Sequence, residues 1–259
     1  MRSRLLLLTV TIIQFCLLPC RGQPAPTLPS PQTTPLHTLR DKKTGLEFVW
    51  IPKGSFNMGF GSRDEEEFPQ LGVDVEGFWL SKNVVTVRQY QAFCKQTNYS
   101  MPEPPSFNRA WRKKNHPIVG ISWKDAAVFC RWAKLDLPSN SEWEYAARGG
   151  LVDKLYPWGD VFDPHKIHCS KKEYLDSGGT APVGSYPANG YGLFDMMGNV
   201  LQWCKERVSY RHLGLHKHSY SSSGEGWQGY TIRGGSWAHL GSSMFLCAKQ
   251  DAVLDDIRL

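Results

Sequence analysis

Beyond its first 20 residues, the sequence lacks any apolar run long enough to cross a membrane. The one long apolar stretch, LLLLTVTIIQFCLL, follows Arg2 and Arg4 and is shorter than the roughly 20 residues of a bilayer-spanning helix. A basic start, a short apolar stretch and a cleavage site near Gly22 are typical of a secretory signal. We therefore expect a signal peptide over residues 1–22, no membrane span, and a secreted or extracytoplasmic mature protein in the secretory lumen or periplasm.

Acylation of Cys20, as in a bacterial lipoprotein, is an alternative fate for this N-terminus. Pro19 directly before the cysteine is a poor match to such a signal, so we favour simple cleavage before Gln23.

The sequence also lacks the cysteine spacing of a structural zinc site, because no two cysteines form a CxxC pair. An oxidising compartment permits disulfides, and an odd number of cysteines leaves at least one thiol unpaired within the chain. Cys94 and Cys130 fall on the apolar faces of two predicted helices, so we interpret both as small core residues. The cysteines beyond the signal are Cys94, Cys130, Cys169, Cys204 and Cys247.

The chain has no strong excess of charge, with 30 Lys and Arg against 24 Asp and Glu and a formal net charge of +6. The basic residues look scattered along the sequence, so we attribute the charge to solubility and expect no nucleic-acid partner. We interpret the run Arg112–Lys114 as a solvated loop. No Walker-type or Ser-His-Asp signature is present.

Proline punctuates residues 23–43, where QPAPTLPSPQTT predicts a disordered linker before a single domain over residues 44–259. LEFVWI from Leu46 predicts a strand, FNMGF is a candidate for the returning strand, and VEGFWLSKNVV predicts another. Three helices are predicted by capping boxes that begin at Thr86, Ser122 and Ser139. From Leu151 onward turns dominate, which indicates short strands and long loops.

The motifs taken in order are specific. HPIVGISWKDAAVFCRWAKLDLPSNSEWEYAARGG, YPWGD, GTAPVGSYPANGYGLFDMMGNVLQWC and RGGSW together resemble the formylglycine-generating enzyme family, also called sulfatase-modifying factors. The resemblance implies a variant of the C-type lectin fold, a loop-rich α+β domain with little regular secondary structure. It also implies a mixed set of functions. Active members oxidise a sulfatase cysteine to formylglycine with oxygen and a copper ion held by two thiolates, while others are inactive paralogues, accessory proteins or display domains.

The resemblance assigns the two copper-binding thiolates to positions that hold His239 and Met244 in this chain. Neither side chain can exchange with a substrate cysteine, a step that needs a thiolate. We therefore expect no copper site and no catalytic residues. Cys247 lies three residues past Met244 and is either a buried structural cysteine or a disulfide partner, although a register slip could bring it toward the site.

The resemblance also implies a calcium site formed by Asp195, Gly198, Val200 and Gln202. Calcium prefers oxygen ligands, and Gln202 stands where the family has Glu, so one negative charge is lost. We expect a weakened calcium site; the alternative is a plain structural loop in which Asp195 caps a turn. Asn98 begins an Asn-Tyr-Ser glycosylation sequon, which matters in a eukaryotic source.

The function that we predict is binding by an inactive member of this family. The partner would be an exported protein, a peptide or a glycan, with a sulfatase as one candidate. The alternatives are a formylglycine-generating oxidase with an unusual ligand set around His239, Met244 and Cys247, and an accessory protein of the cell envelope. Family members continue through a closing strand, which the sequence predicts to be missing or truncated after Asp256. The predicted ligand surface is Ser236, Trp237, Ala238, His239, Ser242, Ser243 and Met244.

Overall fold

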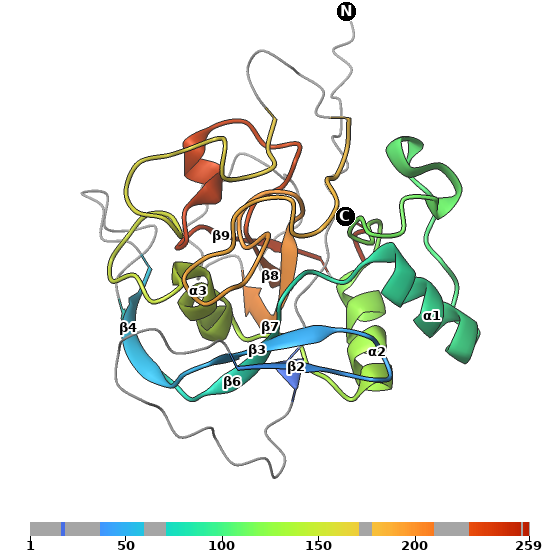
Figure 1. Ribbon diagram of the computed structural model, residues 1–259, viewed down its shortest axis with the longest axis horizontal. Coiled ribbons are helices and arrows are strands. Elements are labelled where there is room, and N and C mark those ends of the chain that lie inside the picture. Colours follow the sequence, from blue (N-terminus) through green and yellow to red (C-terminus); the bar gives the residue numbers. More distant parts are fainter. Residues whose placement is uncertain are drawn as a thin grey trace, which may run out of the picture.

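The computed structural model describes residues 17–18, 37–59, 71–170, 178–209, 228–254 and 256–258. It shows a mixed α+β architecture in which short helices and small antiparallel sheets are joined by long irregular segments, as the sequence predicted (Figure 1). None of the helices in these ranges is long and apolar enough to cross a membrane. The predicted signal peptide lies outside the described residues, apart from Leu17 and Leu18.

The three α-helices begin where their capping boxes predict. In α1 (Val87–Thr97) the Thr86 hydroxyl accepts from the Gln89 backbone N–H, and the Gln89 side chain accepts from the Thr86 N–H. The same reciprocal pair starts α2 (Trp123–Ala133) and α3 (Asn140–Arg148). Each box satisfies two backbone donors that a helix leaves without partners, so these starts follow from four-residue local interactions.

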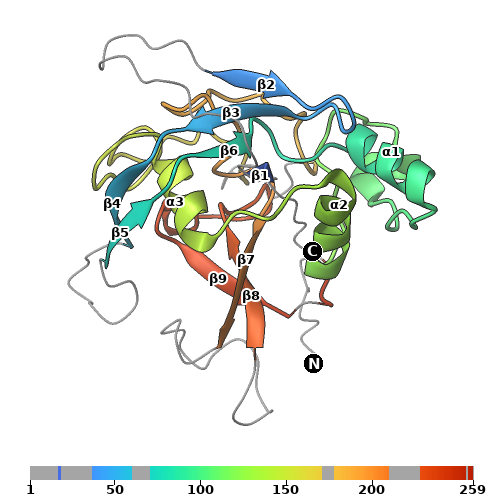
Figure 2. The ribbon, with the colours of Figure 1, turned by 90° about the horizontal axis from the view of Figure 1, so that it is seen from below.

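Two main sheets lie on opposite sides of the molecule, with α2 and α3 at the level between them (Figure 2). The first has the order β1-β6-β3-β2 and the second the order β7-β8-β9, and all pairings are antiparallel. The strands of the first are β1 (Leu17–Leu18), β2 (Thr38–Arg40), β3 (Glu47–Ile51) and β6 (Phe78–Ser81). Those of the second are β7 (Gln202–Ser209), β8 (Gln228–Arg233) and β9 (Gln250–Val253).

Two predictions about this half of the chain need correction. The candidate returning strand, β4 (Gly54–Met58), does not pair with β3 but with β5 (Leu71–Val75), in a separate two-stranded sheet. Residues 37–43 of the predicted linker are ordered, because β2 pairs with β3 over Thr38–Arg40. Both errors concern pairing between distant segments, which period-2 patterning does not specify. Residues 23–36 lie outside the described residues.

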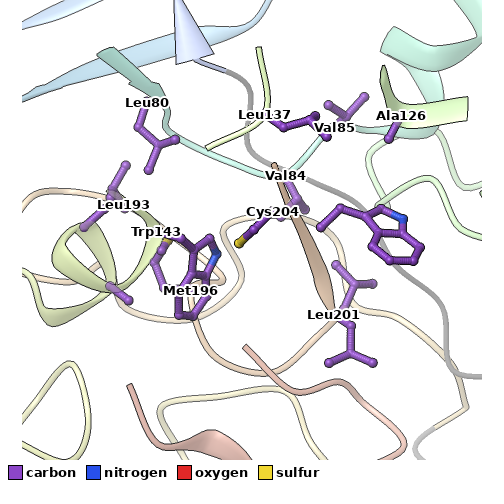
Figure 3. Packing of buried hydrophobic residues seen from close by; sticks show 14 of the residues in the cluster. Leu80, Val84, Val85, Ala126, Leu137, Trp143, Leu193, Met196, Leu201 and Cys204 are labelled. Carbon is purple, nitrogen blue, oxygen red and sulfur yellow. The ribbon is translucent and has the colours of Figure 1, made fainter. Parts of the chain in front are cut away.

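The core is built around α3, β7 and the irregular segment before β7. Trp143 of α3 and Cys204 of β7 point toward Leu80, Leu193 and Met196 in Figure 3, and each of these five side chains is buried. The irregular segment is held by side-chain bonds to its backbone. Asn199, for example, accepts from the Ala181 N–H at 3.0 Å and donates to the Ala181 carbonyl at 3.2 Å. These bonds let a loop pass through the interior without unsatisfied peptide groups.

Candidate functional site

The predicted ligand surface begins at the turn that follows β8. Gly234 and Gly235 both have left-handed φ values, +92° and +67°, and a Cβ on Gly235 would lie 2.7 Å from the Phe245 ring. Glycine is therefore required at position 235 by conformation and by close packing. The turn leads into the next residues, which we call the 236–244 segment. This segment ends within the one-turn 3₁₀ helix Ser242–Phe245.

His239 fastens this segment to the turn. Its Nδ1 accepts the backbone N–H of Ser236 at 3.0 Å and lies 3.3 Å from the Ser236 hydroxyl oxygen. Burial lowers the pKa of the imidazole, so the ring is neutral near pH 7, with its proton on Nε2. His239, at a position to which the resemblance assigns a thiolate, thus stabilises the turn and holds the segment in its conformation.

Aromatic side chains support the segment from two sides. The Trp237 ring packs edge-on against Phe107 at 5.5 Å between centroids, and Phe245 stacks on Phe162 at 5.9 Å. The Tyr156 hydroxyl donates to the Ser242 carbonyl at 3.3 Å. Ser242 and Ser243 are exposed, Trp237 and Met244 are half-buried, and Ser236 is buried. The surface therefore combines polar and apolar side chains that neighbouring aromatic rings hold in place. Ser236 is buried, so it stabilises the turn and is not available to contact a ligand.

A small pocket of about 110 Å³ continues the surface beyond Tyr156. Trp158, which stacks on Tyr156 at 5.4 Å, lines it together with Tyr186 and the cation Lys166. Asp195 also lines the pocket, so its aromatic wall suits a planar polar group of a ligand that can contact both a cation and a carboxyl group.

The 236–244 segment itself contains no cysteine, and Cys247, which follows it, is not accessible to solvent. Cys247 is fully buried, and its backbone N–H donates to the Leu155 carbonyl at 2.8 Å. Burial raises the pKa of its thiol to about 12, so the nucleophilic thiolate is not populated near neutral pH. Of the sequence alternatives for Cys247, the structure matches the buried structural cysteine, and no disulfide joins the five cysteines of the described residues.

The cysteine thiols give a direct test of this burial. We expect a disulfide-forming aromatic reagent at mildly alkaline pH to leave Cys204 and Cys247 of the native protein unlabelled, because both are fully buried with raised pKa values. After unfolding in guanidinium chloride, both should react. Peptide mapping by mass spectrometry assigns each label. Rapid native labelling of Cys247 would show that this thiol reaches the surface.

A buried ionic network supports the turn from below. Glu144 of α3 is fully buried, and its Oε2 accepts from Arg233 at 3.0 Å while its Oε1 accepts from Arg148 at 2.7 Å. The Gly59 N–H also donates to Glu144 Oε1, at 2.9 Å. Arg233 continues to the carbonyls of Cys247 and Lys249. One carboxylate thus connects α3, the residue before the GGS turn and the segment before β9.

The residues expected to bind calcium lie together but are arranged as a closed hydrogen-bond network. Gln202 Oε1 accepts from the Trp143 indole N–H at 2.7 Å, and Gln202 Nε2 donates to the Asp195 carbonyl at 2.7 Å. An indole nitrogen is only a donor, so Trp143 fixes which end of the amide carries oxygen. The amide therefore directs N–H, not oxygen, at the backbone carbonyl of Asp195.

The Asp195 carboxylate and the Gly198 carbonyl of this set are also engaged. The Asp195 carboxylate accepts from the Gly184 N–H at 2.8 Å and from Asn199 at 3.3 Å, and the Gly198 carbonyl accepts from the Val200 N–H at 2.7 Å. Burial raises the pKa of Asp195 to about 6. Calcium needs about six to eight oxygens and deprotonated carboxylates. The Gln202 amide, which presents its N–H to the Asp195 carbonyl, does not fit that ion as a ligand.

Several residues of this region carried no recognisable sequence signal. Glu144 and Arg148 have the spacing of an ordinary exposed helix pair, yet they are buried. Phe107 sits in a loop with no periodicity. Arg233 directly before the GGS turn was the one available hint, since a charged residue at the end of a strand next to a buried turn needs a partner.

Comparisons with known proteins agree with the fold described above. A sequence profile of the sulfatase-modifying factor enzyme 1-like domain matches residues 34–255. The formylglycine-generating enzyme of Mus musculus is 30% identical over 222 residues, which cover 64% of this chain and 59% of that protein. The inactive C-alpha-formylglycine-generating enzyme 2 of Mus musculus is 28% identical over 243 residues, covering 73% of each chain.

Among solved structures, PvdO from Pseudomonas aeruginosa is similar, with a TM-score of 0.69 at 23% identity. The match covers 88% of this chain and 95% of PvdO, and at that identity it speaks for the fold alone. The chain spans 59% of the length of the first mouse relative, so similarity to that enzyme does not by itself assign its activity.

Proposed function

The chain belongs to the sulfatase-modifying factor family, and from that premise we propose that it is a catalytically inactive, extracytoplasmic member that acts by binding. Its partner would be an exported protein, peptide or glycan, with a sulfatase as the first candidate. The binding surface would be the 236–244 segment with the adjoining pocket beside Trp158.

One expectation carries the proposal: the resemblance to the family assigns the copper-binding thiolates of its oxidases to positions that hold His239 and Met244 in this chain. Copper(I) is bound tightly by paired soft thiolates, and the oxidase reaction needs a thiolate to engage the substrate cysteine. The His239 Nδ1 is used by the turn, and the thiol of Cys247 is buried with a raised pKa. The chemistry of this set supports binding rather than oxidation.

The shape of the segment supports the same conclusion. Trp237 and Met244 are half-buried on a turn that Phe107, Phe245 and a neutral His239 hold rigid. A rigidly held, partly exposed tryptophan is a frequent anchor of interfaces, and a methionine beside it adapts its shape to the partner. The surface can therefore recognise a partner without any residue that performs chemistry.

A turnover assay tests the inactivity. The purified protein is incubated with copper, oxygen and a synthetic peptide that carries the cysteine motif of a sulfatase, and the peptide is weighed by mass spectrometry. We expect no conversion of cysteine to formylglycine, while the formylglycine-generating enzyme of Mus musculus converts the peptide in parallel. Conversion by this protein would overturn the proposal in favour of an oxidase with an unusual ligand set.

A binding assay tests the surface itself. We expect an exported sulfatase in its unfolded state to bind the protein, and Trp237→Ala and Met244→Ala each to weaken binding at least about tenfold. Met58→Ala is the matched control, because Met58 is another half-buried methionine, located in β4. Equal losses in all three variants, or no sulfatase binding at all, would contradict this assignment of partner and surface.

A further inference from the structure

The lobe formed by α1 and residues 106–116 concentrates positive charge. These two stretches contain six Lys and Arg residues and no Asp or Glu, in a chain whose formal net charge is +6. The residues that join them, 98–105, add one exposed carboxylate, Glu103. The six are Arg88, Lys95, Arg109, Arg112, Lys113 and Lys114. The basic residues that look scattered along the sequence therefore gather on one part of the molecule, and we call these six the cationic surface.

Backbone and side-chain bonds bring the two stretches together. The Arg88 N–H donates to the Lys114 carbonyl at 3.0 Å, and the Val87 N–H donates to the His116 carbonyl at 2.9 Å. Lys114 Nζ donates to Gln91 at 2.6 Å, and Arg88 donates to Asn115 at 3.3 Å. Figure 1 shows α1 and the green segment that follows it as one lobe at the edge of the molecule.

The cations of this lobe are available to a ligand. Five of the six are exposed and Lys114 is half-buried. Within the described ranges none of the six forms an ion pair, whereas other exposed cations such as Lys154 and Lys205 do. Like charges held close together repel, and an anionic ligand relieves that repulsion.

The loop that presents Arg109 and Arg112 is held in an uncommon backbone conformation. Ala110 and Trp111 have φ values of 52° and 54°, in the left-handed region that residues with a Cβ seldom enter. The buried Trp111 indole donates to the Pro102 carbonyl at 2.9 Å, and the Asn108 side chain bonds the backbone of Lys113. Such a conformation persists only where surroundings enforce it, and it is common at ligand sites.

The composition of the lobe indicates which kind of anion fits. No large hydrophobic side chain is exposed between residues 87 and 116, so the apolar anchors of a typical protein interface are missing there. Amide side chains, among them Gln91 and Asn115, lie beside the cations and can bond hydroxyl groups. Cations interleaved with amides complement a chain that carries both anionic groups and hydroxyls.

We propose that the cationic surface binds a linear anionic polysaccharide that carries sulfate or carboxylate groups. The surface adjoins the 236–244 segment, because Phe107 of the same loop packs against Trp237. A bound polysaccharide would therefore lie next to the partner surface and concentrate the protein where such chains occur. This inference concerns different residues from the proposed partner surface and does not depend on it.

The test measures binding to heparin as a function of salt. The variant Arg109→Gln, Arg112→Gln, Lys113→Gln removes three exposed cations of the surface whose side chains form no described hydrogen bond. The control Lys42→Gln, Lys53→Gln, Arg207→Gln removes three exposed cations elsewhere. We expect the wild type and the control to elute from a heparin column at similar salt, and the surface variant to elute much earlier. The slope of log Kd against log salt should fall by about two to three in the surface variant.

Two outcomes would overturn the proposal. Equal losses in the control and the surface variant would show that only the net charge matters. Tighter binding to single-stranded DNA or polyglutamate than to heparin, at equal salt, would show that the ligand is a different polyanion. Circular dichroism and thermal unfolding of both variants establish that they are folded, and Phe107→Ala should leave heparin elution unchanged while it alters the partner surface at Trp237.

Discussion

Replacing Glu144 with alanine is expected to destabilise the protein by about 3–5 kcal/mol, the largest loss that we predict for a single side chain. The carboxylate is fully buried and accepts hydrogen bonds from Arg233 and Arg148. Both guanidinium groups are themselves at least 95% buried. Without Glu144 two buried cations lose their counter-ion and cannot reach water, which is far more costly than losing an exposed pair.

Urea unfolding followed by circular dichroism measures this effect. Lys205→Ala is the matched control, since it breaks the Lys205–Asp136 pair, whose side chains are 57% and 51% exposed. We expect that control to cost no more than about 1 kcal/mol. Glu144→Gln, which keeps the shape and one acceptor, should fall between the two. A loss below 1 kcal/mol for Glu144→Ala would mean that the two arginines find other partners.

Gln202→Glu is expected to make the stability of the fold depend strongly on calcium. The wild-type amide donates to the Asp195 carbonyl, while its oxygen accepts from Trp143. A carboxylate keeps the bond from Trp143 but faces the carbonyl with oxygen instead of N–H. We expect a loss of roughly 1–3 kcal/mol in the presence of a chelator, because a buried acceptor loses its donor and a buried charge is added.

Calcium should recover that loss in the variant alone. A cation can bridge the new carboxylate and the Asp195 carbonyl, and a calcium concentration one hundred times its Kd would add about 2.7 kcal/mol. The measurement is thermal unfolding with calcium or with a chelator. Gln202→Met is the control, because it removes both hydrogen bonds without adding a charge and should be destabilised in both conditions. A wild-type protein stabilised by calcium to the same extent would show that the Gln202 network does accept the ion.

The proposed cationic surface and the proposed partner surface meet at Phe107. Phe107 belongs to the loop that presents Arg109 and also packs on Trp237, so it is the direct contact between them. A ligand on either surface can alter the other only through such a contact, and the Phe107→Ala variant separates the two effects. Family membership does not by itself specify either ligand, because members of one fold carry different functions.

Local features of the sequence determined much of the fold. The capping boxes at Thr86, Ser122 and Ser139 fixed three helix starts, because a helix start depends on hydrogen bonds within four residues. The GGS turn was recognisable because only glycine tolerates its geometry. The expectation that His239 and Met244 replace the thiol pair also came from the sequence, since the identity of a residue needs no coordinates. These features led from the sequence to the family and to the expectation of a binding protein.

Tertiary structure alone decided the rest, because the deciding contacts join residues far apart in the chain. Arg233 and Glu144 are 89 residues apart, and Gln202 and Trp143 are 59 apart, so neither spacing nor periodicity relates them. The pairing of β4 with β5 and the gathering of Arg88 with Lys114 have the same origin. The sequence determined which chemical groups the protein possesses, and long-range packing determined which of them are buried as partners and which remain exposed to bind a ligand.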